Sequence, residues 1–339
     1  MDSVLGDSGY VKLGADWAIW VNGDTGAIIA AHVDGMTACG TEKQLEEAKQ
    51  KIGLVLGVKD LGNITRCLNI TCTYDDDAAN AQFYLSQPDY IKRLLEEYGM
   101  QQLYDVSTPA LESDRERWEN KELPLLDDRN KKKYQALVGC LLYLMHATRP
   151  DIVYTIIRLS KCSAYPRSPH CEGLKRILRY LEGTKDTVLA LGGGTKDNSL
   201  VGYINAAHAD NASGRSTCCY LFLWDGSPMS WCSKAQRTVA LSTTEAEFMA
   251  GTEATKEAVW ILALLRQLCM PDTCTLRGNN QGWLALPANL VYHQRTKHID
   301  IRQKFISKIV NRGVVSVQYV PTKHMLADGF TKPLPKEIH

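Results

Sequence analysis

The order of apolar runs beyond residue 199 constrains the fold more than any other feature of the sequence. Three runs rich in apolar, β-branched and aromatic residues come first, and a long helical pattern precedes further alternating strands and helices. The strands are expected at 200–208, 217–224, 228–234, 273–278 and 314–320, and the helices at 243–268, 281–310 and near 324–331. A three-strand meander followed by strands separated by helices is typical of a mixed β-sheet covered by helices. The order therefore predicts an α+β or α/β fold.

The first 110 residues also mix strands and helices. Two apolar runs flank Asn22-Gly23-Asp24, which predicts a β-hairpin. A helical pattern follows Thr41, which is expected to be its N-cap, and a strand is expected over 66–75. A second helix is expected over 86–100, with Pro88 in its first turn.

The middle of the chain divides at a charged segment and at a glycine-rich segment. Residues 111–133 are charged and poor in apolar residues, which favours an exposed linker, and two or three helices are expected over 134–181. In the last of them Lys175, Arg176 and Arg179 form either a solvated helix face or a phosphate contact. "LGGGTKDNS" over 191–199 predicts a flexible joint before a final domain at 195–339.

Composition and charge exclude several classes of protein. The 339 residues are 45% hydrophobic and 23% charged, as in folded globular proteins. The net charge of +1 gives no global attraction to nucleic acid or anionic lipid, so any such binding needs a local patch. No apolar run approaches a membrane span, and the opening lacks the pattern of a signal peptide. We expect an intracellular protein, in cytoplasm or nucleus, whose eleven cysteines are reduced.

Several sequence words resemble one family of mobile elements. In the C-terminal half these are "STTEAEFMA", "VYHQRTKHIDIR", "YVPTKHMLAD" and "TKPLP", and upstream they are "HVDGM", "KDLGNI", "SQPDYIKRLLEEYGM", "ALVGCLLYLMHATRPDIVY" and "LKRILRYLEGT". They resemble the Pol polyproteins of copia-type LTR retrotransposons. The resemblance implies a reverse-transcriptase palm and thumb remnant at 1–110, a charged linker at 111–133, a helical connection at 134–190 and a ribonuclease H-like domain at 195–339.

The resemblance also implies a ribonuclease H site. Enzymes of this family cleave the RNA strand of an RNA/DNA hybrid with two Mg²⁺ ions, or Mn²⁺, held by four carboxylates. Carried over by motif, the four acid positions are Asn205, Glu247, Asn279 and Asp328. Two of the four are amides, so Glu247 and Asp328 are the remaining metal-ligand candidates, and the loss of two family charges weakens metal binding.

The polymerase motif of the family is also incomplete. Where the family has two consecutive aspartates on a hairpin turn, this sequence has Asp34 followed by Gly35. Asp34-Gly35 is equally an ordinary turn pair. The resemblance therefore implies no RNA-directed DNA synthesis by this chain alone.

The function implied is that of a reverse transcriptase and ribonuclease H segment acting on RNA/DNA hybrids, truncated and catalytically degraded. Two alternatives stay open: a non-catalytic module that binds nucleic acid or protein, and a decayed remnant without function. The sequence leaves the oligomeric state open and predicts no membrane partner. It also assigns no function to His208-Ala209-Asp210 after the first strand of the final domain, and it places Trp283 where a smaller residue is expected.

Overall fold

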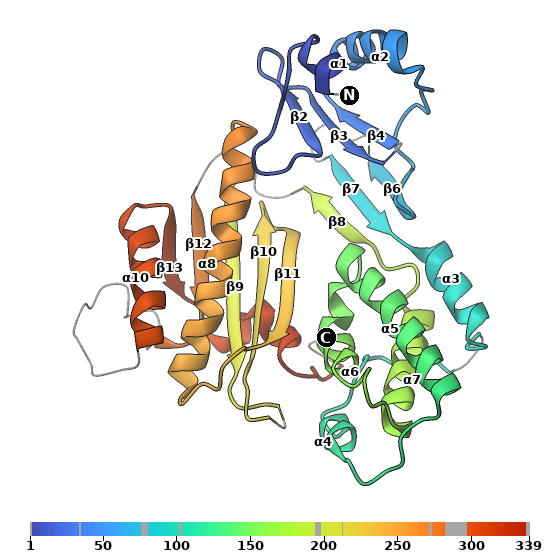
Figure 1. The fold of residues 1–339 in the computed structure, drawn as a ribbon, viewed down its shortest axis with the longest axis vertical. Coiled ribbons are helices and arrows are strands. Elements are labelled where there is room, and N and C mark those ends of the chain that lie inside the picture. The colour runs from blue at the N-terminus through green and yellow to red at the C-terminus, as the bar shows by residue number, and fades with distance from the viewer. Residues whose placement is uncertain are drawn as a thin grey trace. The chain divides into compact units, whose positions relative to one another are not determined.

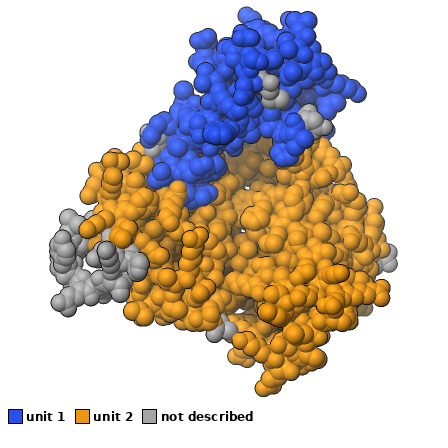
Figure 2. Space-filling view, in the orientation of Figure 1, with its two compact units in different colours: residues 1–65, 257–272 blue, residues 66–256, 273–339 orange. Residues whose placement is uncertain are grey.

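The protein has an α+β fold, which confirms the predicted fold class. The computed structural model describes residues 2–33, 35–75, 81–101, 104–193, 198–211, 213–270, 273–281 and 297–336. Two compact units divide the chain: residues 1–65 with 257–272, and residues 66–256 with 273–339 (Figure 2). None of the helices in these described ranges is long and apolar enough to cross a membrane.

The first unit is built on an antiparallel sheet in the order β1-β2-β3-β4. Its elements are α1 (Asp2–Gly6), β1 (Tyr10–Lys12), β2 (Ile19–Asn22), β3 (Ile28–His32), β4 (Gly35–Cys39) and α2 (Glu42–Leu56). The hairpin expected around Asn22 is confirmed, because β2 and β3 pair antiparallel. Thr41 caps α2 in a capping box with Gln44, as its side-chain type predicts. Trp20 and Ile29 of the sheet share a buried cluster with Ile52 of α2.

The second unit begins with an antiparallel sheet in the order β5-β6-β7-β8. Its strands are β5 (Arg66–Cys67), β6 (Ile70–Asp75), β7 (Gln82–Ser86) and β8 (Leu189–Gly192). The single strand expected over 66–75 is therefore wrong. Leu68 and Asn69 adopt positive φ values of 49° and 60°, so they form a tight turn and the two halves pair as a hairpin. β8, at the start of the glycine-rich segment, pairs with β7.

Helices occupy most of the sequence between β7 and β8. They are α3 (Pro88–Glu97), α4 (Asp114–Glu119), α5 (Asp128–Ala147), α6 (Val153–Ser160) and α7 (Ser168–Gly183), with a 3-10 turn at Pro150–Ile152. The segment expected as an exposed linker includes α4 and the start of α5. Trp118 of α4 is buried because Gly173 of α7 leaves room for its indole ring. The sequence left the role of three cationic side chains on α7 undecided. Of these, Arg176 donates a hydrogen bond to Thr108 Oγ1, and Arg179 donates one to the carbonyl of Tyr104.

The predicted mixed sheet is present, in the order β11-β10-β9-β12-β13 (Figure 1). The strands are β9 (Leu200–Ala207), β10 (Thr217–Trp224), β11 (Ser227–Ala235), β12 (Cys274–Gly278) and β13 (Val315–Tyr319). The first three form the expected meander, and β12 and β13 are parallel to β9. Helices α8 (Thr243–Gln267) and α10 (Lys297–Asn311) make the crossovers, and two 3-10 turns, η2 (Thr322–His324) and η3 (Leu326–Phe330), follow β13.

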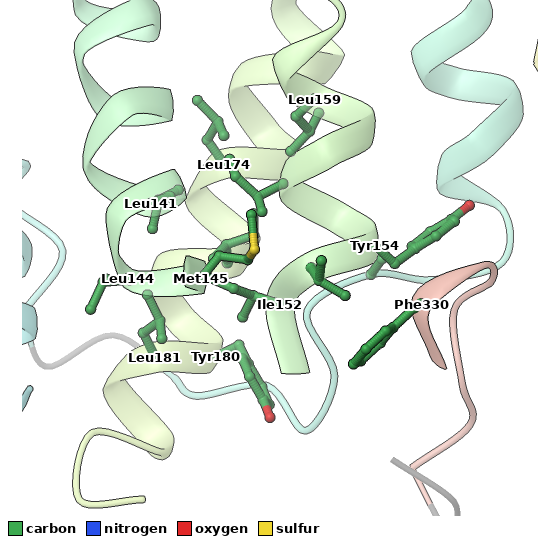
Figure 3. Packing of buried hydrophobic residues seen from close by; sticks show 14 of the residues in the cluster. Leu141, Leu144, Met145, Ile152, Tyr154, Leu159, Leu174, Tyr180, Leu181 and Phe330 are labelled. Atoms are coloured by element: carbon green, nitrogen blue, oxygen red, sulfur yellow. The ribbon is translucent and has the colours of Figure 1, made fainter. Parts of the chain in front are cut away.

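One hydrophobic cluster joins the helices α3–α7 to this sheet. Figure 3 shows the helical part of this cluster together with Phe330. Leu144 and Ile152 lie in its helical part, and Tyr203, Leu221 and Phe330 contribute from β9, β10 and η3. The indole N–H of Trp231 on β11 also donates to the carbonyl of Met145, 2.9 Å away. Helices and sheet therefore share a core across the glycine-rich segment. The four-domain division stays a prediction.

Gly202 on the central strand β9 gives a test of this packing. A Cβ at Gly202 would lie 2.5 Å from the ring of Phe222 and 2.7 Å from a methyl of Leu276, both fully buried. We expect Gly202→Ala to lower the free energy of unfolding by about 1–3 kcal/mol through overpacking. The matched control is Gly139→Ala on α5, where a Cβ meets nothing within 4 Å and removing a helical glycine should stabilise by up to about 1 kcal/mol. Urea unfolding measures both, and equal effects would contradict the packing described.

Candidate functional site

The pairing of the central strands brings two of the four candidate positions to one edge of the sheet. Asn205 lies near the end of β9, opposite Cys219 of β10. On the other side β12 runs parallel to β9, and its last residue, Gly278, pairs with Ile204. Asn279 follows directly, so it lies beside Asn205 at about the strand spacing of 4.8 Å.

Asp328 reaches the same edge from η3, and its carboxylate is held by two donors. Asn205 Nδ2 donates to Asp328 Oδ1 at 2.5 Å. Lys332 Nζ lies 2.6 Å from Asp328 Oδ2. The Asn205 amide is oriented by its other end, because the N–H of Ala206 donates to Asn205 Oδ1 at 2.8 Å. An aspartate at 205 could not donate this hydrogen bond to Asp328.

Glu247, in the second turn of α8, is buried near Asp328. Its side chain is 6% exposed, and within the described residues its Oε2 atom has no hydrogen-bond partner. The pKa of Glu247 is raised to about 8, mainly by burial; the backbone N–H of Ala206 lowers it and the negative charge of Asp328 raises it. Removing an ionised carboxylate from water is costly, so the neutral acid is favoured.

Asn279 shares the edge, but its side chain bonds to a different partner. It is half-buried, and its Nδ2 donates to Thr322 Oγ1 at 3.4 Å. The structure thus brings Asn205, Glu247 and Asp328 together, and the pairing of β12 with β9 places Asn279 beside Asn205. Of the remaining sequence candidates, Asp34 and Trp283 lie outside the described residues.

The donor set does not fit a pair of divalent ions. Mg²⁺ takes hard oxygen ligands, and two ions need several converging negative charges. Here an amide N–H and an ammonium group hold the two oxygens of Asp328. No group of three or more His, Cys, Asp or Glu side chains suited to a metal occurs in the part of the chain that the structure describes.

Sequence reasoning missed Lys332 and Cys219. Lys332 follows Asp328 by four residues, a spacing at which opposite charges commonly pair, and this signal could have found it. Cys219 Sγ lies 3.4 Å from the carbonyl oxygen of Asn205 and 3.2 Å from that of Ala327. Burial raises the pKa of this thiol well above its usual value, so it stays neutral. The sequence carried no signal for its place beside the site.

Comparison with known proteins identifies the family. The chain is 33% identical over 345 residues to the retrovirus-related Pol polyprotein from transposon TNT 1-94 of Nicotiana tabacum, covering 99% of this chain and 26% of that protein. It is 31% identical over 232 residues to a transposon Ty5-1 protein of Saccharomyces cerevisiae, covering 68% of this chain and 73% of that protein. The chain belongs to the copia-type retrotransposon Pol family.

This chain spans about a quarter of the tobacco copia-type relative. No protein-family model matches it. Among solved structures, the foamy viral protease–reverse transcriptase in complex with double-stranded DNA is 13% identical, with a TM-score of 0.49, over 87% of this chain and 46% of that one.

The buried carboxyl of this copia-type chain predicts a pH-dependent stability. The unfolded chain loses the Glu247 proton near the ordinary pKa of 4.5, whereas the folded chain keeps it to about pH 8. Between these values the unfolded state binds fewer protons, so the wild type loses stability as pH rises. Glutamine cannot ionise. The stability of Glu247→Gln relative to wild type should therefore rise between pH 5 and 8, by at most about 1.4 kcal/mol per pH unit.

Urea unfolding at pH 5 and pH 8 in EDTA measures this difference. Glu253→Gln is the matched control, because Lys234 and Lys256 bond Glu253 and lower its pKa to about 2 despite partial burial. Glu253 is then ionised in both states from pH 5 upward, and its difference should stay flat. A flat difference for Glu247→Gln would contradict the buried neutral acid.

Proposed function

We propose that the chain is a catalytically degraded reverse transcriptase and ribonuclease H segment that binds RNA/DNA hybrids without cleaving them. Membership of the copia-type Pol family supports the hybrid as the partner. A chain acting on such hybrids is expected inside the cell, in the cytoplasm or the nucleus.

The observation that carries the proposal is the hydrogen bond from Asn205 to Asp328. In a site for two metal ions, both positions would present oxygen atoms to the ions. Here position 205 presents an N–H group to Asp328, and Lys332 supplies a positive charge to the same carboxylate. The side chains of Asn205, Asp328 and Lys332 therefore satisfy one another without a metal ion.

Electrostatics gives the size of the effect. A pair of unit charges about 4 Å apart interacts by about 4 kcal/mol at an effective dielectric constant near 20. Replacing two carboxylates by amides removes two attractions to each divalent ion nearby, and each is about twice as large because the ion carries two charges. An ion would also have to displace or tolerate Lys332, which lies 2.6 Å from Asp328. Paired-metal chemistry is therefore not expected from this donor set, although Mg²⁺ or Mn²⁺ serves the family.

The polymerase activity of the family is not part of the proposal. Asp34 is followed by Gly35 where the family motif has a second aspartate. A metal pair cannot form from the one remaining carboxylate of that motif.

We predict no cleavage of an end-labelled RNA/DNA hybrid by the purified chain in Mg²⁺ or Mn²⁺, with binding of the same hybrid retained in EDTA. Gel electrophoresis measures cleavage, and fluorescence anisotropy measures binding. Cleavage that Glu247→Gln abolishes would refute the degraded site. Absence of any hybrid binding would instead favour the decayed remnant.

Restoring the two lost charges should restore cleavage. We expect Asn205→Asp combined with Asn279→Asp to cleave the hybrid in Mg²⁺, and each single change to do much less, because two ions share the four carboxylates. Without metal, repulsion among the acids should lower the melting temperature, and Mg²⁺ should raise it again by binding the folded state. The matched control is Asn198→Asp with Asn311→Asp, the same charge change at two exposed positions. A double mutant that neither cleaves nor responds to Mg²⁺ would show that more than charge has been lost.

A further inference from the structure

A cavity of about 620 Å³ lies in the second unit, away from the candidate site. The cavity is lined by residues of α4, α6 and α7, of the segments that follow α4 and α6, and of the loop after β9. No residue of the candidate site contributes to its lining. Its size is within the range of ligand pockets in proteins.

The lining is strongly basic, although the whole chain is almost neutral. Five cationic side chains line the cavity, against a single carboxylate, that of Glu119. The cations are Arg115, Lys121, Arg158, Lys161 and Arg167. Because the whole chain carries a net charge of only +1, binding of an anion needs a local basic patch. This cavity provides such a patch.

Arg158 is already neutralised and has a structural role. Its guanidinium lies 3.2 Å from Asp210 Oδ2, donates to the Asp210 carbonyl at 2.8 Å, and donates to Asn211 Oδ1 at 2.8 Å. Both charged side chains are less than 10% exposed. Asp210, in the segment that had no assigned role, thus fixes the loop after β9 against α6.

The other cations lack comparable compensation. Lys161 donates to the same Asn211 oxygen at 3.0 Å, and its pKa is lowered by desolvation and then by Arg158. Arg115 lies 3.8 Å from Glu119. Across the described ranges, neither Lys121 nor Arg167 forms an ion pair. Counting Glu119 and Asp210 against the five cations leaves three positive charges uncompensated at the cavity.

Tyr165 adds an aromatic surface to the same cavity. Its side chain lines the cavity and is 70% exposed, although most aromatic rings of this size pack into a core. Lys131 Nζ lies 5.8 Å from its ring centroid. An exposed aromatic ring beside several cations is the combination that binds the stacked bases and the phosphates of a single strand.

We propose that this cavity binds single-stranded nucleic acid. Lys121, Lys161 and Arg167 contact the phosphates, and Tyr165 stacks on a base. A single strand is favoured over a duplex because the faces of its bases are free to stack on the ring. It is favoured over a lone phosphate because neither the aromatic surface nor the volume is needed for that ion. The proposal does not rest on hybrid binding, since the two sites share no residue.

The test measures fluorescence anisotropy of a labelled oligothymidylate with the full chain over a range of salt concentrations. Lys121→Gln with Arg167→Gln should weaken binding roughly tenfold near physiological salt and lower the slope of log affinity against log salt by about 1.4, since two phosphate contacts are lost. Tyr165→Ala should weaken binding at least about fivefold and leave that slope unchanged. Lys43→Gln with Lys51→Gln, both exposed on α2, is the matched charge control and should have no such effect.

Circular dichroism of each variant checks that it is folded. The substitutions at Lys121, Tyr165 and Arg167 all replace side chains outside the buried core. Inorganic phosphate and thymidine monophosphate should compete only at far higher concentrations than unlabelled oligothymidylate. The proposal is overturned if the wild type does not bind the strand, if the pocket variants bind as tightly as the control, or if a duplex or the mononucleotide binds this cavity as tightly as the strand.

Discussion

The arrangement of the second unit depends on the pairing of β9 between β10 and β12. β9 is buried on both faces along most of its length, and Gly202 leaves room there for Phe222 and Leu276. Its parallel register with β12 puts Asn279 beside Asn205, and its antiparallel register with β10 puts Cys219 beside Asn205. A shift of one residue would turn Asn205 to the opposite face. The candidate site therefore depends on one strand register.

The shared core gives η3 its position and hence positions Asp328. Met325, Ala327 and Phe330 flank Asp328 and are buried in the cluster that includes the helices α5–α7. Ser233 of β11 donates to the carbonyl of Phe330 at 2.8 Å. Asn205 and Asn279 are compatible with the same packing as aspartates would be, because asparagine has nearly the shape of aspartate. The fold therefore does not depend on carboxylates at these two positions.

The loop after β9 and the sheet edge that carries the candidate site are stabilised by different ion pairs. At the edge of the sheet that carries the candidate site, Lys332 and Asn205 bond to the carboxylate of Asp328. At the loop, Asp210 satisfies Arg158, and further cations remain around the cavity. The sheet edge is therefore nearly neutralised by its own side chains, whereas the cavity keeps an excess of positive charge.

The sequence by itself determined the order of strands and helices, the hairpin at Asn22, the Thr41 cap and the family, because these depend on local periodicity, capping chemistry and contiguous words. It missed the hairpin turn at Leu68-Asn69, since neither residue is a glycine that signals positive φ. It also missed the pairing of Lys332 with Asp328 and of Arg158 with Asp210. The partners of the second pair are 52 residues apart, and no local pattern encodes such a contact. Only the tertiary structure decided which side chains meet at the site edge and around the cavity, because side-chain contacts between distant segments depend on strand register and core packing.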